Sequence, residues 1–302
     1  MAELRFDDQV AVVTGAGGGL GREYALLLAR RGAAVVVNDI SAGADDAAAN
    51  VVEEIRAFGG RAAVDTHSVA TPEGGAAIID TAVDAYGRVD IVINNAGIVR
   101  DKSFHNLTPD LLDVVLDVHL RGAFYVTQPA WRLMREQRYG RVVFTSSSSG
   151  ILGNFGQSNY GAAKMALVGL TRVLAAEGER YGLRVNAIAP SALTGMTEAN
   201  LTDFVGDLAP HYVAPVVAWL AHRDVSVNGE VFTSGAGRVA RFFIGMTTGY
   251  TNPGLTIEHV AAHIDEIRDE TGYTVPAGPA DEFAAISAAA RQAAATQDPR
   301  PA

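Results

Sequence analysis

The chain has 302 residues, of which 48% are hydrophobic and 19% charged, so it can bury the core of one large α/β domain. The formal net charge of −10 and the lack of any cluster of lysine and arginine exclude a protein that binds the phosphate backbone of nucleic acids. We find neither a signal peptide nor an apolar run of membrane-spanning length, and therefore expect a cytoplasmic protein without a membrane partner. The absence of cysteine excludes disulfides, thiolate nucleophiles and cysteine-bound zinc.

The first motif is a glycine-rich turn between a predicted strand at 10–14 and a predicted helix at 23–31. Gly15, Gly19 and Gly21 let the backbone approach a pyrophosphate, and the helix N-terminus offers N–H groups and a partial positive charge. Leu20 stands where the common Gly-x-Gly-x-x-Gly motif has its last glycine. The turn favours a dinucleotide site, and the alternative is a turn that only packs the helix on the strand.

A second predicted strand, 33–39, ends in Asp39, eighteen residues after Gly21. A carboxylate at this place accepts hydrogen bonds from an adenosine ribose and repels a 2′-phosphate. Positions 18 and 40 are Gly18 and Ile40, so no basic side chain is offered to such a phosphate. The pattern predicts NAD rather than NADP. Asp39 could instead, or in addition, cap the helix expected near position 44.

Strands and helices continue to alternate along the chain. Further strands are predicted at 61–66, 89–93, 141–146, 183–188 and 229–233, and helices at 44–58, 72–86, 108–138, from about 157 onward, and at 213–220. This order predicts an α/β fold of the Rossmann type, a doubly wound parallel sheet flanked by helices. We expect residues 1–249 to form one domain that binds NAD and contains the catalytic site. Because the composition shifts near position 250, we expect 250–302 to be a helical extension that packs on a partner subunit.

The chemistry is expected around Tyr160 and Lys164, which are four residues apart and share one face of a helix. A free phenol has a pKa of about 10, and a cation within ~4–6 Å lowers it by ~1–3 units, so a phenolate base becomes accessible near neutral pH. The chain has only two lysines, Lys102 and Lys164, and uses arginine at its other basic positions. A lysine here therefore indicates a need for a compact ammonium. Ser147, at the end of a predicted strand, could hold a substrate oxygen.

Two histidine patterns need separate interpretation. His119 lies within the long predicted helix at 108–138. His259 and His263 are four residues apart, as zinc ligands can be, but no third ligand is evident. We interpret that pair as one polar face of a helix and expect no metal site.

These motifs together resemble the short-chain dehydrogenase/reductase family over roughly residues 6–240. They occur in the order Thr14-Gly15-x-x-x-Gly19-x-Gly21, Asp39, Asn94-Asn95-Ala96-Gly97, Ser147, Tyr160-x-x-x-Lys164 and Pro190. The resemblance implies hydride transfer on NAD, with Tyr160 as acid and base, Lys164 on the nicotinamide ribose, Ser147 on the substrate oxygen and His119 as a further catalytic residue. The cofactor-binding residues that it implies are Gly15, Gly19, Leu20, Gly21, Asp39, Ser68, Val69, Asn95, Ala96, Gly97, Tyr160, Lys164, Pro190 and Leu193.

Within the family, residues 96–104, 118–124, 153–160 and 212–220 are similar to the dehydrogenase unit of peroxisomal multifunctional enzyme type 2. This similarity implies a stand-alone homologue that oxidises (3R)-3-hydroxyacyl-CoA, with a small molecule as its partner and a homodimer or homotetramer as its assembly. The alternatives are a 17β-hydroxysteroid dehydrogenase, a 3-ketoacyl carrier reductase and a dinucleotide-sensing scaffold without catalysis. For an acyl-CoA we expect cations from Arg100, Lys102 and Arg121, and apolar contacts from a loop at 192–208 that contains Leu193, Met196, Leu201 and Phe204.

Two positions depart from the family pattern. His119 stands where the family has Asn, which bears on the usual water-mediated proton relay through the catalytic lysine. Residues 66–68 read Thr-His-Ser where the family has an Asp near the adenine. We therefore expect adenine contacts from the backbone at 66–68.

Overall fold

The computed structural model describes residues 3–40, 46–194 and 207–297. The chain divides into two compact units, Met1–Phe242 and Phe243–Ala302. Three residues of the expected substrate loop, Met196, Leu201 and Phe204, lie outside the described residues. No helix in the described ranges is long and apolar enough to cross a membrane.

The first unit is built on an eight-stranded sheet in the order β3-β2-β1-β4-β5-β6-β7-β8. The strands are β1 (Val10–Thr14), β2 (Ala34–Asn38), β3 (Arg61–Asp65), β4 (Ile91–Asn94), β5 (Gly140–Thr145), β6 (Leu183–Pro190), β7 (Val231–Gly235) and β8 (Arg238–Phe242). Strands β1 to β7 are parallel, which confirms the predicted doubly wound sheet, and β8 pairs antiparallel with β7. Strands β2 and β3 lie on one side of β1, whereas β4 and the strands after it lie on the other side, so the strand order reverses between β1 and β4. Ligands bind at this point of such sheets, beyond the carboxyl ends of the strands.

Strand β8 is an addition that the sequence did not predict. Ala236 and Gly237 form the connection to β7, and both have positive φ, 49° and 77°. A two-residue turn of this kind joins twisted antiparallel strands, but it usually carries Asn-Gly or Asp-Gly, and this sequence lacks that signal.

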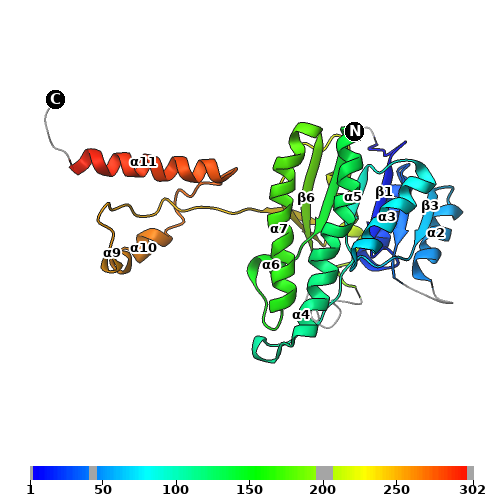
Figure 1. Ribbon diagram of the computed structural model, residues 1–302, viewed down its shortest axis with the longest axis horizontal. Coiled ribbons are helices and arrows are strands. Elements are labelled where there is room, and N and C mark those ends of the chain that lie inside the picture. Colours follow the sequence, from blue (N-terminus) through cyan, green and yellow to red (C-terminus); the bar gives the residue numbers. More distant parts are fainter. Residues whose placement is uncertain (1–2, 41–45, 195–206, 298–302) are drawn as a thin grey trace. The chain divides into compact units, whose positions relative to one another are not determined.

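Helices cover both faces of the sheet (Figure 1). In the first unit they are α1 (Gly19–Arg30), α2 (Ala47–Ala57), α3 (Pro72–Tyr86), α4 (Pro109–Leu116), α5 (Gly122–Gln137), α6 (Ser148–Leu152), α7 (Ser158–Gly178) and α8 (Ala214–Ala221). One apolar cluster joins α1, α2 and α8 to the sheet, and a second joins α3, α5 and α7 to the opposite face. The long helix expected at 108–138 is present as α4 and α5, with a π-helical turn, η2 (Asp117–Arg121), between them.

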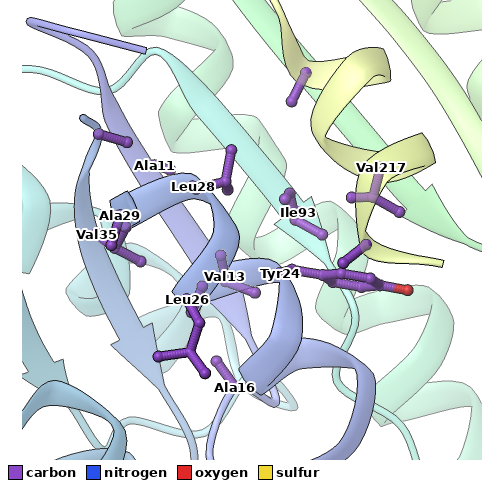
Figure 2. Close-up of a cluster of buried hydrophobic side chains, with 14 of the residues drawn as sticks. Ala11, Val13, Ala16, Tyr24, Leu26, Leu28, Ala29, Val35, Ile93 and Val217 are labelled. Carbon is purple, nitrogen blue, oxygen red and sulfur yellow. The ribbon is translucent and has the colours of Figure 1, made fainter. Parts of the chain in front are cut away.

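Alternate residues of β1 show why a continuous apolar run forms a central strand. Ala11 and Val13 belong to the first cluster, whereas Val10 and Val12 belong to the second, and all four are buried. Figure 2 shows part of the first cluster, with Tyr24 of α1 lying beneath Val217 of α8. Both faces of a parallel sheet are covered, so its strands are apolar on both sides.

The second unit contains α9 (Ile257–Ala262), α10 (Ile264–Arg268) and α11 (Pro279–Gln297). An antiparallel β-bridge joins Met246 to Thr274, and next to it the rings of Phe243 and Tyr273 stack with centroids 5.5 Å apart. His263 stacks on Tyr250 rather than on His259, and no group of three potential metal ligands occurs among the residues described.

Candidate active site

The glycine turn is fixed to the end of β4 by hydrogen bonds. The Asn95 side-chain amide donates to the carbonyl oxygens of Thr14 and Gly15, each at 3.0 Å. In return, the Thr14 hydroxyl accepts from the backbone N–H groups of Asn95 and Ala96 at 3.0 and 3.1 Å. These four bonds make the ends of β1 and β4 one rigid platform, named here the β1–β4 latch.

Two glycines of the turn leave no room for a side chain. Gly15 has a φ of 61°, and a Cβ placed on it would lie 2.7 Å from the Cα of Ala96. A Cβ on Gly21 would lie 2.2 Å from the carbonyl oxygen of Gly15. The sequence therefore has glycine here because the turn packs closely on β4 and on itself.

A cavity of about 390 Å³ opens above the turn, at the carboxyl ends of the strands. Most of the predicted site residues line it, namely Gly15, Gly19, Leu20, Asp39, Ser68, Val69, Asn95, Ala96, Gly97, His119, Ser147, Tyr160, Lys164 and Pro190. The residues that line it without having been predicted are Gly18, Asn38, Ile40, Ile98, Val118, Thr145, Ser146, Ala192 and Thr194. The sequence thus indicated most of one cavity from motifs that are far apart in the chain.

Gly21 and Leu193 are predicted cofactor residues that lie outside the lining of this cavity. Gly21 is buried under the turn, where it permits the packing described above. Leu193 is 39% exposed, and its backbone N–H donates to the carbonyl of Leu208 at 2.8 Å.

Asp39 lies at the end of β2 and contacts the glycine turn directly. Its Oδ2 accepts from the backbone N–H of Gly17 at 2.9 Å. The alternative role as a helix cap is wrong, because Asp46 caps α2 by accepting from the N–H of Ala49 at 3.0 Å. The carboxylate is therefore held in the cavity wall by the turn that it faces.

Asp65 is a buried carboxylate that the sequence did not single out. It accepts from the Asn38 amide and the Thr81 hydroxyl, both at 2.7 Å, and from the backbone N–H of His67 at 3.1 Å. Its second oxygen also lies 2.9 Å from Nδ1 of His67. These bonds fix the segment that leads into Ser68 and Val69 in the cavity wall, and a local pattern could not predict partners so distant in sequence.

Helix α7 places Tyr160 and Lys164 one turn apart in the cavity. Its start is fixed by Asn159, a buried residue whose amide donates to the carbonyls of Arg100 and Leu111, each at 3.0 Å. The Asn159 side-chain oxygen accepts from the backbone N–H of Tyr160 at 2.8 Å. Asn159 was not predicted, because nothing in the sequence indicates that two distant backbone segments meet there.

Lys164 is buried, and its ammonium donates to the carbonyl oxygen of Thr145 at 2.6 Å. Burial lowers the pKa of Lys164 to about 7, because the charged form loses its solvation. The Ser146 hydroxyl donates to the Lys164 carbonyl at 2.8 Å and so ties the helix to the end of β5. Lys164 can therefore gain or lose a proton near neutral pH.

The expected lowering of the Tyr160 pKa is wrong for the site in this structure. Burial raises the pKa of Tyr160, Asp101 adds to this, and a hydrogen bond with Ser147 opposes it. The Lys164 ammonium lies 5.5 Å from the centre of the Tyr160 ring and donates to Thr145 instead. Ser147 also caps α6, where its Oγ accepts from the N–H of Ser149 at 3.2 Å.

His119 lies in the π-helical turn and packs edge-on against Tyr160, with ring centroids 5.2 Å apart. Its Nε2 lies 3.0 Å from the N–H and 2.7 Å from the carbonyl oxygen of Ile98, so it can accept from one or donate to the other. Nδ1 is buried and has no hydrogen-bond partner among the described residues. Burial, with the nearby charge of Lys164, lowers the pKa of His119 to about 3, so the ring is neutral at physiological pH.

A second cavity, of about 10 Å³, borders both His119 and Lys164. Thr14 and Asn94 complete its polar wall. This is about the volume that one water molecule needs, and the unpartnered Nδ1 and the ammonium would supply polar partners.

Comparisons with known proteins agree with this geometry. A family model described as "short chain dehydrogenase" matches residues 9–204. The chain is 45% identical over 284 residues to peroxisomal multifunctional enzyme type 2 of Mus musculus, covering 90% of this chain and 38% of that protein. It is 41% identical over 246 residues to hydroxyacyl-CoA dehydrogenase ChsB1 of Mycobacterium tuberculosis, covering 74% and 76%. The structure of full-length peroxisomal multifunctional enzyme type 2 from Drosophila melanogaster matches with a TM-score of 0.80 and 40% identity, over 94% of this chain and 50% of that one.

The chain therefore belongs to the short-chain dehydrogenase family, and it is an oxidoreductase that acts on CH–OH groups. Enzymes with this fold generally use a nicotinamide cofactor. The chain spans less than two thirds of the mouse and fly multifunctional enzymes that it matches.

Proposed function

We propose that the protein oxidises the secondary alcohol of a (3R)-3-hydroxyacyl-CoA to a 3-ketoacyl-CoA and uses NAD. The observation that carries this proposal is the presence of Ser147, Tyr160 and Lys164 in the same cavity as the glycine turn and Asp39. The acyl-CoA is supported by the relative named as a hydroxyacyl-CoA dehydrogenase, which is 41% identical to this chain.

The residues around the turn fit a nicotinamide dinucleotide. Gly15, Gly19 and Leu20 suit the pyrophosphate, because they line the cavity at the start of α1, where a helix N-terminus offers backbone N–H groups to an anion. Asp39 suits the adenosine ribose and disfavours a 2′-phosphate. We assign the adenosine end to Ser68, Val69 and Asn95, and the nicotinamide end to Ala96, Gly97, Tyr160, Lys164 and Pro190. When bound, the nicotinamide ring accepts the hydride that leaves the substrate carbon.

Tyr160 accepts the hydroxyl proton, and Ser147 donates a hydrogen bond to the same substrate oxygen. Because burial raises the pKa of Tyr160, it needs nearby positive charge to act as a base near neutral pH. Lys164 supplies such a charge in its protonated form, and the low pKa of this buried ammonium lets it pass a proton onward.

His119 takes the position at which the family has Asn. We assign it a place in the proton path, since its unpartnered Nδ1 and the Lys164 ammonium border the same water-sized cavity. A single water there would connect the two groups. A neutral imidazole can accept a hydrogen bond from such a water or donate one to it, so it can serve where an amide serves in other members.

We further propose a homodimer or homotetramer in the cytoplasm, in which residues 1–249 bind NAD and residues 250–302 pack on a partner subunit. Sedimentation velocity of the full chain tests the assembly. A monomer at micromolar concentration would contradict it.

The substrate assignment is tested by following NADH absorbance with both enantiomers of 3-hydroxybutyryl-CoA and with estradiol. We expect turnover of the (3R) thioester only, because inversion moves the hydroxyl away from Ser147 and Tyr160. A preference for the (3S) isomer, or for the free steroid over every acyl-CoA tested, would overturn the assignment. Reduction of a 3-ketoacyl carrier with NADPH at higher efficiency would instead indicate the carrier reductase, and NAD binding without any turnover would indicate a dinucleotide sensor.

A further inference from the structure

Three large apolar side chains stand exposed beyond the catalytic residues. Leu152, Phe155 and Phe104 are 71%, 92% and 81% exposed, more than any other described large hydrophobic residue of the first unit. Leu152 ends α6, Phe155 follows it, and Phe104 begins a short 3-10 turn ahead of α4. The turn after α6 and the loop before α4 lie side by side in Figure 1.

Polar contacts hold these two loops in place. The backbone N–H of Lys102 donates to the carbonyl of Gly156 at 2.9 Å, and Lys102 and Gln157 form a parallel β-bridge. The buried amide of Gln157 donates to the Asp101 carboxylate at 2.8 Å. Phe104 and Phe155 each lie two residues from this bridge, so a fixed framework holds both rings in the solvent.

Two cations lie on the same edge. Arg100 and Lys102 are exposed, and neither forms an ion pair with a described carboxylate. Asp101, between them, is engaged by Gln157. Arg121, which the sequence suggested as a third cation, is instead paired with Asp117.

This edge is continuous with the active site. Ile98, at the start of the first loop, lines the cavity, and residues 148–159 connect Ser147 to Tyr160. A substrate that reacts at Tyr160 and extends out of the cavity on this side therefore crosses the loops that carry Phe104 and Phe155.

We infer that Arg100, Lys102, Phe104, Leu152 and Phe155 form a binding site for the 3′-phospho-ADP head and pantetheine arm of coenzyme A. This inference rests on the proposed function. Phosphates suit the two cations, an adenine ring can stack on an exposed phenylalanine, and the dimethyl group of pantetheine suits the leucine. A free steroid has no charge for Arg100 and Lys102. In a protein of net charge −10, two cations without an ion pair among the described residues, on loops that carry exposed phenylalanines, fit an anionic nucleotide.

The test compares two thioesters with the same acyl group, (3R)-3-hydroxybutyryl-CoA and (3R)-3-hydroxybutyryl-pantetheine, which lacks the nucleotide. The full-length wild-type chain should show a kcat/KM at least tenfold higher for the CoA thioester. In the double variant Arg100→Gln with Lys102→Gln, and separately in Phe155→Ala, kcat/KM should fall at least tenfold more for the CoA thioester than for the pantetheine thioester, so that the ratio moves toward one. These substitutions keep the backbone groups that join the loops.

Arg30→Gln is the matched control, since Arg30 is an exposed arginine beside an aromatic ring, 5.0 Å from the centre of Phe58, and does not line the cavity. It should leave the ratio intact. Equal kcat/KM for the two thioesters in the wild-type chain, or an equal loss for both in the variants, overturns the inference. A shift in sedimentation for Phe155→Ala at an unchanged ratio assigns the rings to contact with a second copy and also overturns it. If the wild-type chain oxidises neither thioester, the proposed function itself fails.

Discussion

Tyr160 is the proposed acid and base, and its hydroxyl can be removed without touching the glycine turn. Tyr160→Phe removes the acid and base but none of the contacts of the glycine turn, so kcat should fall by the ~10²–10⁴ typical of a lost proton-transfer group. The Kd for NAD, measured by fluorescence titration, should change less than about threefold. Substantial turnover of this variant at any pH would show that another group takes the proton.

Asp39 combines a structural contact with a proposed role in cofactor choice. Asp39→Asn keeps an oxygen for the Gly17 N–H and removes only the charge, so it isolates the electrostatic effect. We expect kcat/KM of the wild-type chain to be about 100-fold higher with NAD than with NADP, because like charges in contact cost several kcal/mol. In the variant this ratio should be smaller by tenfold or more. Comparable kcat/KM for both cofactors in the wild-type chain would refute the role, and Asp46→Asn, at the α2 cap, is the control.

His119 should make stability depend on pH in a defined window. Its pKa is about 3 in the fold and about 6.5 when unfolded, so between these values the unfolded chain binds more protons. The stabilisation of the fold by neutral, buried His119 is therefore fully present above pH 6.5. It is lost as the pH falls toward 3, by at most about 1.4 kcal/mol of unfolding free energy per pH unit. The difference in urea unfolding free energy between wild type and His119→Asn should therefore shrink or reverse as pH falls from 6.5 to 4.5.

The same histidine separates the relay from simple packing. His119→Asn should retain activity, whereas His119→Leu should slow turnover by roughly 10²–10⁴. Full activity of the Leu variant would leave His119 as a packing residue of the π-helical turn.

At the level of elements, the hydrogen bonds of Asn159 position the start of α7. Asn159→Ala removes the donors to the Arg100 and Leu111 carbonyls, two part-buried hydrogen bonds that each contribute about 0.5–1.5 kcal/mol. Because the helix start carries Tyr160, we expect kcat to fall at least tenfold while the Kd for NAD changes little. Thermal unfolding and kinetics on one preparation check both effects, and unaltered kcat would show that α7 is placed by other contacts.

The elements also show what the sequence can and cannot predict. The apolar strands and the turn, Asp39, Ser147 and Tyr160 were predictable, because each is signalled by its immediate neighbours or by a fixed spacing. Asp65, Asn159 and the π-helical turn were not, since their roles come from contacts between distant segments. Strand β8 was missed because its five residues are mostly exposed and lack a usual turn signal.

For the whole molecule, cofactor binding and folding are linked. NAD at about 100 times its Kd should stabilise the chain by about 2.7 kcal/mol, since it binds only the folded form. For a unit of this size that corresponds to a rise in Tm of roughly 5–10 °C. Differential scanning fluorimetry should show this rise with NAD and a much smaller one with NADP at the same concentration, and the reverse order would contradict the choice of cofactor.

The β1–β4 latch joins residues 81 positions apart in the chain, because the Asn95 amide holds the carbonyl of Thr14. The glycine turn therefore acquires its final shape only after β4 has been added to the sheet, although the turn itself is among the first segments to be synthesised. During translation at ~5–20 residues per second, the carbonyl oxygens of Thr14 and Gly15 therefore lack the Asn95 donor for several seconds after they emerge. A ribosome-bound chain that ends before Asn95 has the complete phosphate-binding sequence but not the contact that gives the turn its shape.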